Sequence, residues 1–590
     1  MNERKNSQQP QCGFGLLNLS CNVCGFGPCR INPFESDDQK TICGASRDTI
    51  VAWNFLRDIT DGSIIFFKEL EKLIRDFKES VRQQAFPEPS KEEISKCFEN
   101  LLAKFRKETD AITLSDLLLK FLFEEKIFVE LLESLFPEKI LEEWKEKNIL
   151  PSFPSDEIFN GLLRANFGVS SDPLHLIIQA LRCSIVGLGC SMLLYRLKDL
   201  IYGSPVLREG YIGLGTLSGK DINIVVKELP IVLANQLFKE LENSEIEKYI
   251  QEKEVKKINI VGLGAFGLDL LIRNGVPCCG GALDIEQVIS TGRTDLVILD
   301  ELCNLFSISD LTKKYSTKFL SFSPLVKIEH VEKIDYVPKQ AKKVATDILR
   351  LAVESYKRRK ELAKFHKEKS EVRYRVSVKC LKELTSDEIS LLARTISEGH
   401  IKGIVLLVGC EKPPENVKDK ILKFVEKLVE NNILVLCSGC WVYSVVDSLL
   451  MAGKFDEKAG EELKKVCKQL GILPVTLLGS CTELGRGLEL FVQISKDLKV
   501  DLNKLPFAVM VINYINNLVL NLGVSGATIG VTSFVSSSKA LSSNEVLRIL
   551  QDEVESLTGG RIVFETNVDK SFETLFDLLV DKSDLLAESI

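Results

Sequence analysis

Apolar side chains recur at helical spacing in the first third of the chain, between about residues 46 and 200. Leu118 and Leu122, four residues apart, illustrate the stripe that this spacing places along one face of a helix. Ser90 and Glu93 stand at the spacing of a capping box, so that a helix is expected to begin there. The pattern predicts a mainly helical region.

From residue 221 onward the pattern changes to short runs rich in β-branched residues, separated by helical stretches. Strands that alternate with helices in this way predict parallel sheets covered by helices. The expected strands cover residues 222 to 226, 258 to 262, 295 to 300, 403 to 409, 432 to 437 and 474 to 479.

A charged helix over about 341 to 369 divides the strands into two blocks, and we interpret the run of Lys and Arg at 357 to 360 as its solvated face. We therefore predict a multidomain α/β fold. A mainly helical domain at 1 to 220 carries an amino-terminal cysteine motif, and two Rossmann-like domains with parallel sheets follow at 221 to 372 and 373 to 590.

Composition limits the partners and the compartment. With 590 residues and 45% hydrophobic content, the chain is too long for a single core. Its 76 basic and 83 acidic residues leave a net charge of -7 without a dense basic block, which argues against nucleic acid as a partner. The amino terminus is polar, and we find no apolar run near the ~20 residues of a membrane helix. These features predict a cytoplasmic protein without membrane contact.

Four of the 17 cysteines form a tight motif near the amino terminus. Cys21, Cys24, Cys29 and Cys43 follow the spacing C-x2-C-x4-C-x13-C, which suits a cubane 4Fe-4S cluster because short gaps can direct neighbouring thiolates at neighbouring irons. Glycine-rich gaps can also donate backbone N–H groups to cluster sulfurs. Ser46 can cap the following helix and direct its positive end at the cluster. Zinc is the competing ligand.

Four further cysteines follow predicted strands, namely Cys303, Cys410, Cys440 and Cys481. Ligands of open α/β sheets collect beyond the carboxyl ends of the strands, so these thiols can converge on one crevice. Taken singly, each is also explained as a small buried residue, since free cysteine is among the most buried residue types.

The run C-x2-C-x4-C-R, followed by CGAS and DTIVAWNFLR, resembles the opening of the nickel carbon monoxide dehydrogenases, which are relatives of the hybrid-cluster proteins. The resemblance extends from Cys12 to about Thr558 and implies a homodimer. It implies that the quartet binds the internal 4Fe-4S relay cluster. The family has two further cysteines just upstream for an intersubunit cluster. Here only Cys12 is present, with Ser20 at the other position, which argues against that cluster.

The resemblance also assigns roles to the strand-end residues. Cys303, Cys440 and Cys481 fall on positions that ligate the catalytic cluster of the family, and Cys410 matches a cysteine that carries a persulfide in the hybrid-cluster proteins. Lys539, in the sequence SSSK, matches the lysine that the family uses near bound carbon dioxide, so it is our candidate catalytic residue.

Other ligand positions of the family are not matched. Its HGH-type histidine motif corresponds to residues 227 to 230, which read KELP, and its G-x-C-C-x-G turn corresponds to 262 to 267, which read GLGAFG. A last cysteine is expected near 507 to 514, FAVMVINY, and a histidine-rich proton path corresponds to 62 to 67, GSIIFF. One imidazole and two thiolates are thus missing, which argues against nickel because selectivity rests on ligand type, number and geometry.

Two smaller features remain open. The turn at 262 to 267 spells G-x-G-x-x-G between a strand and a helix and could cradle a pyrophosphate, with Asp284 or Glu286 as the acidic partner. Cys278 and Cys279 could instead replace a missing thiolate. The four histidines are isolated and are interpreted as surface or satisfied core residues: His175, His330, His366 and His400.

These observations favour an iron-sulfur oxidoreductase with the carbon monoxide dehydrogenase fold that does not process carbon monoxide. It would hold a 4Fe-4S cluster and a second iron-sulfur or iron-sulfur-oxygen cluster, and it would exchange electrons with a ferredoxin-like carrier. Three alternatives remain: a functional carbon monoxide dehydrogenase, a hybrid-cluster-like reductase of hydroxylamine or a similar substrate, and a non-catalytic electron-transfer or scaffold subunit.

Overall fold

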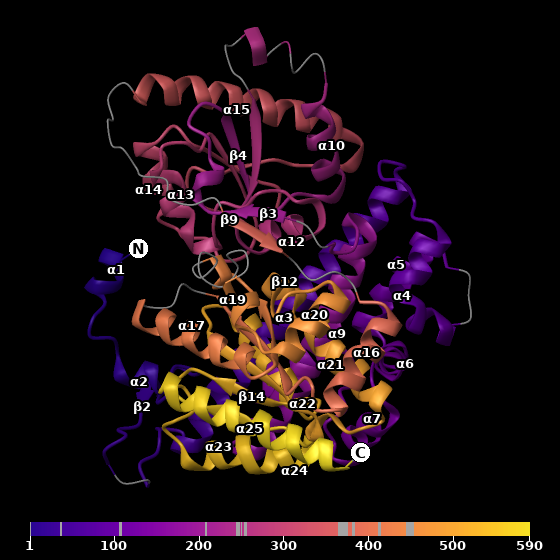
Figure 1. The fold of residues 1–590 in the computed structure, drawn as a ribbon. Coiled ribbons are helices and arrows are strands. Elements are labelled where there is room, and N and C mark those ends of the chain that lie inside the picture. The colour runs from indigo at the N-terminus through magenta and orange to yellow at the C-terminus, as the bar shows by residue number, and fades with distance from the viewer. Residues whose placement is uncertain are drawn as a thin grey trace.

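The computed structural model describes residues 2–589 except 36–37, 106–108, 207–208, 244–247, 249, 253–256, 364–375, 380–383, 411–414 and 444–453. The amino-terminal region is helical (Figure 1), apart from a hairpin of two short strands, β1 (Ser20–Cys21) and β2 (Cys29–Arg30). Its helices are α1 (Asn2–Ser7), α2 (Gly13–Leu16), α3 (Arg47–Arg82), α4 (Lys91–Phe105), α5 (Ala111–Phe123), α6 (Glu125–Leu135), α7 (Glu138–Glu146), α8 (Pro154–Arg164) and α9 (Pro173–Tyr202).

A five-stranded parallel sheet in the order β5-β4-β6-β7-β8 forms the middle of the chain. Its strands are β4 (Ile222–Val226), β5 (Ile258–Gly262), β6 (Leu296–Leu299), β7 (Lys318–Ser321) and β8 (Glu332–Lys333). Its helices are α10 (Ile231–Leu241), α12 (Gly264–Asn274), α13 (Ile285–Ser290), α14 (Ile308–Lys314) and α15 (Ala341–Ala363). A separate antiparallel pair joins β3 (Glu209–Ile212) to β9 (Val376–Lys379).

A six-stranded parallel sheet in the order β12-β11-β10-β13-β14-β15 forms the rest of the chain. Its strands are β10 (Gly403–Gly409), β11 (Ile433–Ser438), β12 (Val475–Gly479), β13 (Phe507–Asn513), β14 (Thr532–Val535) and β15 (Ile562–Phe564). Its helical elements are α16 (Ser386–Ser397), α17 (Glu415–Glu430), α19 (Lys454–Lys458), α20 (Glu461–Leu470), η4 (Cys481–Glu483), α21 (Leu484–Leu498), α22 (Asn517–Thr528), α23 (Asn544–Arg548), α24 (Val554–Thr558) and α25 (Val568–Ser589).

The predicted fold class is confirmed, and the six predicted strands lie within a residue or so of the observed ones. The capping box also forms, since the amide of Ser90 donates to Glu93 at 2.8 Å and the amide of Glu93 donates to Ser90 at 3.2 Å. The interpretation of the run at 357 to 360 was wrong for one residue. Arg359 is buried and pairs with Asp295 at 2.8 Å, because its side chain reaches back to the sheet that α15 covers.

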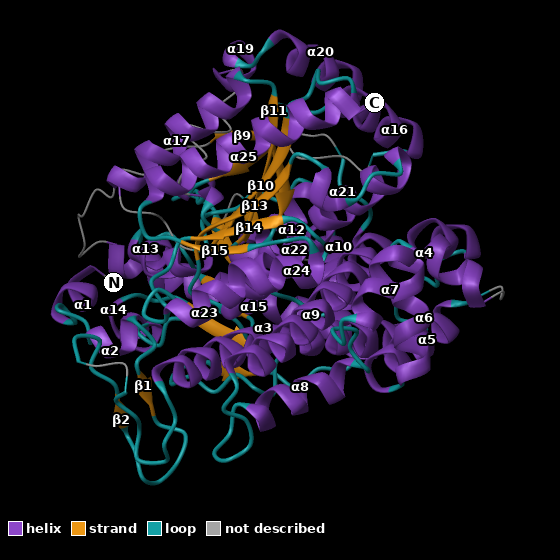
Figure 2. Ribbon diagram, turned by 90° about the horizontal axis from the view of Figure 1, so that it is seen from below, coloured by secondary structure: helices purple, strands orange, loops and turns teal. Residues whose placement is uncertain are grey.

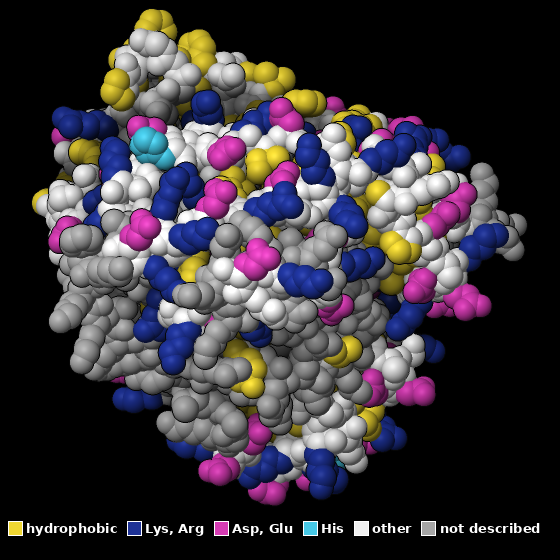
Figure 3. Space-filling view, turned by 90° about the horizontal axis from the view of Figure 1, so that it is seen from above, with side chains coloured by type: hydrophobic (Ala, Val, Ile, Leu, Met, Phe, Trp, Pro, Cys, Tyr) yellow, Lys and Arg dark blue, Asp and Glu magenta, His cyan; other side chains and the backbone are white. Residues whose placement is uncertain are grey.

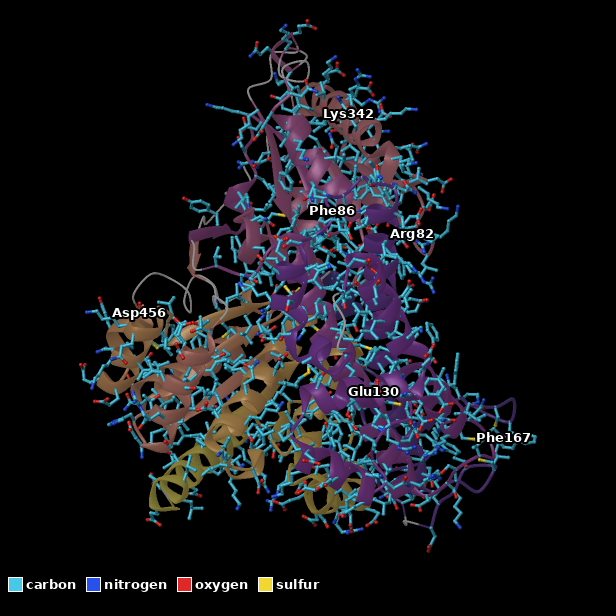
Figure 4. All side chains as sticks on the ribbon, turned by 90° about the vertical axis from the view of Figure 1, so that its right-hand side faces the viewer. Arg82, Phe86, Glu130, Phe167, Lys342 and Asp456 are labelled. Atoms are coloured by element: carbon cyan, nitrogen blue, oxygen red, sulfur yellow. The ribbon has the colours of Figure 1, made fainter. Side chains whose placement is uncertain are left out.

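Helix α9 is the core of the helical region and packs against α3, α8, α21 and α22. Within the described residues it is long and apolar enough to cross a membrane, which the sequence analysis did not anticipate. However, 89% of its most apolar window is buried inside the protein, so neighbouring helices already cover this surface. Figure 4 shows the helical region alongside both sheets, with Arg82 near the five-stranded sheet and Phe167 at the opposite end.

Candidate functional site

Three of the amino-terminal cysteines, Cys21, Cys24 and Cys29, lie on the hairpin of β1 and β2, which projects from the helical region (Figure 2). The strands pair so that Cys21 stands opposite Cys29. Between them the amide of Gly27 donates to the carbonyl of Cys24, and a β-carbon on Gly27 would lie 3.1 Å from the Cys21 carbonyl oxygen. Glycine therefore permits a tight turn that keeps three cysteines of the motif together.

Cys43 supplies a fourth thiol from the loop before α3. The hydroxyl of Thr41 lies 3.2 Å from Cys43 Sγ and lowers the pKa of this exposed thiol. Burial raises the pKa of Cys21, and negative charge on Cys29 or Cys43 raises it further, so these thiols share a small volume. As predicted, Ser46 caps α3 by accepting a hydrogen bond from an amide of the first turn. The positive end of α3 thus follows the motif directly.

Cys12 lies apart from this quartet. It is exposed, and it lines a cavity of about 620 Å³ between the amino-terminal segment and the loops after β13 and β14. The hydroxyls of Ser538 and Ser542 hold the segment there by donating to the carbonyls of Leu16 and Leu17 at 3.0 Å and 2.6 Å. The part of Cys12 in an intersubunit cluster stays a prediction.

Lys539 lines the same cavity. Its ammonium lies 2.6 Å from Asp58 and 5.4 Å from the ring centroid of Tyr514. Burial alone would lower the pKa of Lys539, but Asp58 and Tyr514 outweigh burial and raise it. Lys539 is therefore a charged, ion-paired residue at the carboxyl edge of the six-stranded sheet, and its contact with a substrate stays a prediction.

The four strand-end cysteines come from both sheets. Cys410, Cys440 and Cys481 follow β10, β11 and β12, three adjacent strands of the larger sheet, and Cys303 follows β6 of the smaller one. Burial raises the pKa of Cys481, and negative charge on Cys440, Cys410 or Cys303 raises it further. Burial likewise raises the pKa of Cys440 and Cys303. The charge of each of the other three thiols thus affects the pKa of Cys481, so the four lie near one another, and their joint role as cluster ligands stays a prediction.

The strand-end cysteines suit a cluster better than a single metal ion. Within the described ranges, no three His, Cys, Asp or Glu side chains converge closely enough to hold a single metal ion. A cubane makes a different demand, because each thiolate binds its own iron at a separate corner. Coupled thiols from four strand ends fit that demand, and iron would favour their deprotonated form.

Lys227 follows β4, within the stretch that matches the family's histidine motif. Its side chain is 1% exposed, and its ammonium lies 2.7 Å from a carboxylate oxygen of Asp300. It also donates to the carbonyl of Leu302 at 2.8 Å and to the side-chain oxygen of Asn304 at 2.7 Å. These oxygens belong to the loop that carries Cys303. The buried ammonium of Lys227 therefore holds that loop in place through several contacts.

The neighbouring ligand positions are also filled by packing. Leu229 is buried in the apolar core of the five-stranded sheet. Gly264 begins α12 with φ +69°, and a β-carbon there would lie 3.2 Å from the β-carbon of Ala282. No thiolate or imidazole can come from either residue.

The G-x-G-x-x-G turn serves packing. The amide of Gly262 donates to Pro277 at 2.7 Å, and that of Gly264 donates to Gly280 at 2.9 Å. A β-carbon on Gly262 would lie only 2.5 Å from the α-carbon of Gly267, so the glycines let β5 and α12 touch. Because these amides are already engaged, the structure gives no support to the pyrophosphate alternative.

Cys278 and Cys279 are buried beside the same turn. Their thiols donate to the carbonyls of Gly267 and Gly262 at 2.8 Å and 3.3 Å. Both thiols are therefore engaged by the backbone of the β5 to α12 connection, which speaks against a role as replacement ligands. His175, His330 and His400 lie at the surface, as expected, and His366 falls outside the described residues.

Two asparagines at the strand-end site were missed by the sequence analysis. The side-chain oxygen of Asn513 accepts from the amide of Cys410 at 3.0 Å, and the amide nitrogen of Asn516 lies 3.8 Å from Cys303 Sγ. Asn513 ends β13 and Asn516 follows it, and a polar residue at the end of a buried strand was the available signal. The sequence analysis considered this segment only as an apolar run, so the signal was missed. They are candidates to orient the two cysteines.

A buried ionic network supports the Cys481 turn from behind. Arg273 of α12 contacts Asp199 of α9 at 2.5 Å and Glu483 of η4 at 3.0 Å. Arg486 of α21 joins the same two carboxylates at 2.9 Å and 3.0 Å. The network connects all three regions of the chain, and η4 begins at Cys481.

A helical region followed by two parallel-sheet domains, with one cysteine set on an amino-terminal hairpin and another at the strand ends, defines the class of protein: a multidomain α/β protein built around two cysteine centres. The model of the Prismane/CO dehydrogenase family matches residues 19–569. The chain therefore belongs to the Prismane/CO dehydrogenase family.

Several relatives extend over almost the whole chain. Carbon monoxide dehydrogenase 1 of Methanosarcina mazei is 29% identical, with 98% of this chain and 94% of the relative covered. Carbon monoxide dehydrogenase 2 of Carboxydothermus hydrogenoformans is 26% identical, with 97% and 93% covered. Among solved structures, a nickel-free carbon monoxide dehydrogenase from Thermococcus sp. AM4 is similar with a TM-score of 0.89 and 28% identity, over 99% of this chain and 94% of the other. Carbon monoxide dehydrogenase IV from Carboxydothermus hydrogenoformans has a TM-score of 0.90 and 27% identity, over 99% and 96%.

Proposed function

We propose that this protein is an iron-sulfur redox protein with the carbon monoxide dehydrogenase fold that does not interconvert carbon monoxide and carbon dioxide. Lys227 is the observation that carries the proposal. An ammonium has three donors and no lone pair, so it cannot replace an imidazole ligand. Its ammonium is held by Asp300, Leu302 and Asn304, so the side chain fills this place without offering a ligand atom.

The cysteines supply two cluster sites in this proposal. Cys21, Cys24, Cys29 and Cys43 hold a 4Fe-4S cluster, which exchanges electrons with a ferredoxin-like carrier. A second iron-sulfur or iron-sulfur-oxygen cluster is held by Cys303, Cys410, Cys440 and Cys481. When bound, such clusters supply one-electron chemistry.

Metal analysis after anaerobic purification tests the proposal. Reconstitution with iron, sulfide and nickel is expected to give iron for about two four-iron clusters, substoichiometric nickel and no carbon monoxide-dependent dye reduction above an iron-only control. The variant Lys227→His is expected to restore neither property, since Gly264 and β13 still lack thiolates. Stoichiometric nickel together with carbon monoxide oxidation in the unaltered protein would contradict the proposal.

A second candidate is a reductase of hydroxylamine or a similar small oxidised substrate. It is favoured by Cys410, whose charge is coupled to Cys440 and Cys481 within the same site. Hydroxylamine-dependent oxidation of the dithionite-reduced protein, lost in Cys410→Ser while the iron bound by Cys21, Cys24, Cys29 and Cys43 is retained, would select this function over simple electron transfer.

We also propose that the protein is a homodimer. Large apolar side chains are exposed around the cysteine hairpin and α8, with Phe34 at 95%, Ile42 at 69% and Phe159 at 68%. Phe26 and Phe167 join the two segments, with ring centroids 6.2 Å apart. Figure 3 shows hydrophobic side chains gathered along the upper left edge of the molecule, and Figure 4 shows Phe167 at its periphery. Such a patch is typical of an interface.

Sedimentation of the intact protein tests the dimer. Phe26→Glu together with Phe167→Glu is expected to give a monomer, whereas the control Phe306→Glu, at a side chain 76% exposed elsewhere, leaves the dimer unchanged. A monomeric unaltered protein would contradict it.

The cysteines within the described part of the chain form no disulfides, which supports a reducing cytoplasm as the compartment.

A further inference from the structure

A second cavity, of about 510 Å³, lies at the carboxyl ends of β4 and β6. The chain passes from β4 to β5 on one side of the sheet order and then to β6 on the other side, so the crevice between β4 and β6 is the topological switch point. Open α/β sheets bind their ligands at this place. Helices α3 and α9 form the opposite wall. We call this space the switch-point cavity.

The lysines in the wall of the switch-point cavity are engaged by carboxylates. The pairs are Lys72 with Glu228 at 2.6 Å and Glu301 at 3.3 Å, Lys198 with Asp269 at 2.6 Å, and Lys227 with Asp300 at 2.7 Å. At the rim, Glu71 pairs with Lys68 and Arg75. The positive charges of the wall are thus neutralised by the protein itself, so the described residues of the wall include no free cation for an anionic ligand.

Carboxylate groups remain in excess. Glu69 lines the cavity and has no hydrogen bond or ion pair with any residue that the structure describes. Asp269 is 3% exposed, and its second carboxylate oxygen has no hydrogen-bond partner. Buried polar groups are normally satisfied, so an unpaired buried oxygen in a cavity wall indicates a missing partner.

The rest of the lining is apolar and aromatic. Tyr202 and Phe266 meet edge to face, with ring centroids 6.1 Å apart, and Phe322 and Leu73 complete this side. Aromatic rings attract cations through their negative faces, and an apolar wall favours a ligand with a hydrocarbon body.

We propose that the switch-point cavity binds a small organic ammonium ion, whose charged group contacts Glu69 and Asp269 and whose apolar body lies against Tyr202 and Phe266. The proposal is independent of the clusters, because the cavity wall contains none of the cysteines assigned to them.

Binding is expected to release a proton. Burial raises the pKa of Glu69 to about 8, with Glu228 and Asp300 adding to the rise while Lys72 and Lys198 oppose it. At neutral pH this carboxyl group is therefore mostly protonated. An ammonium ion favours the carboxylate, so its affinity should increase as the pH rises towards 8 and level off above it.

Calorimetric titration of the intact protein with benzylammonium tests the proposal, with benzyl alcohol and benzoate as neutral and anionic controls. We expect saturable binding of one benzylammonium per chain and binding at least about tenfold weaker for both controls, the loss that follows from one charge-assisted contact. Titrations in two buffers of different ionisation enthalpy should show proton release near pH 7.

The variant Glu69→Gln is expected to weaken benzylammonium binding about tenfold and to abolish the proton release. Glu130→Gln on α6, a control carboxylate that does not line the cavity (Figure 4 labels Glu130), should change neither. Asp269→Asn is a second variant of the same site. If Asp269→Asn does not fold, Glu69→Gln and the three ligands decide whether the cavity binds an ammonium ion. Absence of saturable binding, equal affinity for benzoate, or unchanged binding by Glu69→Gln would overturn the proposal.

Discussion

The two cysteine sites are built in different ways. The hairpin site collects its residues from 23 consecutive positions, Cys21 to Cys43, and it is exposed enough that Phe26 beside it is 64% accessible. The strand-end site collects Cys303 and Cys481 from positions 178 residues apart, after strands of two different sheets. A site made by one loop depends on local spacing, whereas a site made by strand ends depends on the packing of whole domains.

The difference affects how each site tolerates change. All four cysteines of the hairpin motif come from one short segment, so the replacement of any one of them leaves no neighbouring strand end to supply another thiol. Beside the strand-end site, Lys227 forms a buried ion pair and Gly264 allows close packing, at positions where the resemblance to the family leads us to expect ligands. A large domain interface can therefore keep its fold while its chemistry changes.

The sharpest test of this comparison removes one ligand from each site. Cys24→Ser is expected to lower iron by about four atoms per chain, the content of one cubane, and to leave the second cluster in place. Cys440→Ser should do the reverse. Iron content and the EPR signals of the reduced protein distinguish the two. The hairpin assignment is refuted if Cys24→Ser retains its iron and its spectrum.

The support of the strand-end site is tested by Arg273→Met. This change leaves Asp199 and Glu483 buried without one of their partners. It should therefore lower the free energy of unfolding by about 3 to 5 kcal/mol. Arg548→Met is the matched control at an exposed ion pair and should change the free energy of unfolding far less, because solvent screens that pair. The first unfolding transition in urea measures both. Equal midpoints for the two variants would show that the network does not hold the domains together.

The smallest expected effect concerns the reactivity of the hairpin. In cluster-free protein, Thr41→Val removes the group that lowers the pKa of Cys43, so its thiolate fraction near pH 7 falls and alkylation by iodoacetamide slows by a few-fold. At a pH above the thiol's ordinary pKa, variant and unaltered protein should react alike. Thr312→Val, whose hydroxyl donates only to a nearby carbonyl, serves as the control. Identical rates at both pH values would remove Thr41 from this role.

Much of the fold could be predicted because its signals are local. Strand β10 is a continuous buried run, and Ser46 and Ser90 begin helices through contacts within a few residues. Arg359 was misread for the same reason: a charged run resembles a solvated face until a partner such as Asp295 arrives from a distant strand.

The sequence by itself determined the hairpin motif and the alternation of strands and helices, since spacing and residue type carry that information. Only the tertiary structure decided which distant residues meet around the strand ends. The pairing of Lys227 with Asp300, the contact of Asn513 with Cys410 and the unpaired oxygen of Asp269 all join residues far apart in the chain. Such pairings matter more in the interior than at the surface, because a buried polar or charged group is destabilising unless another group of the protein pairs with it.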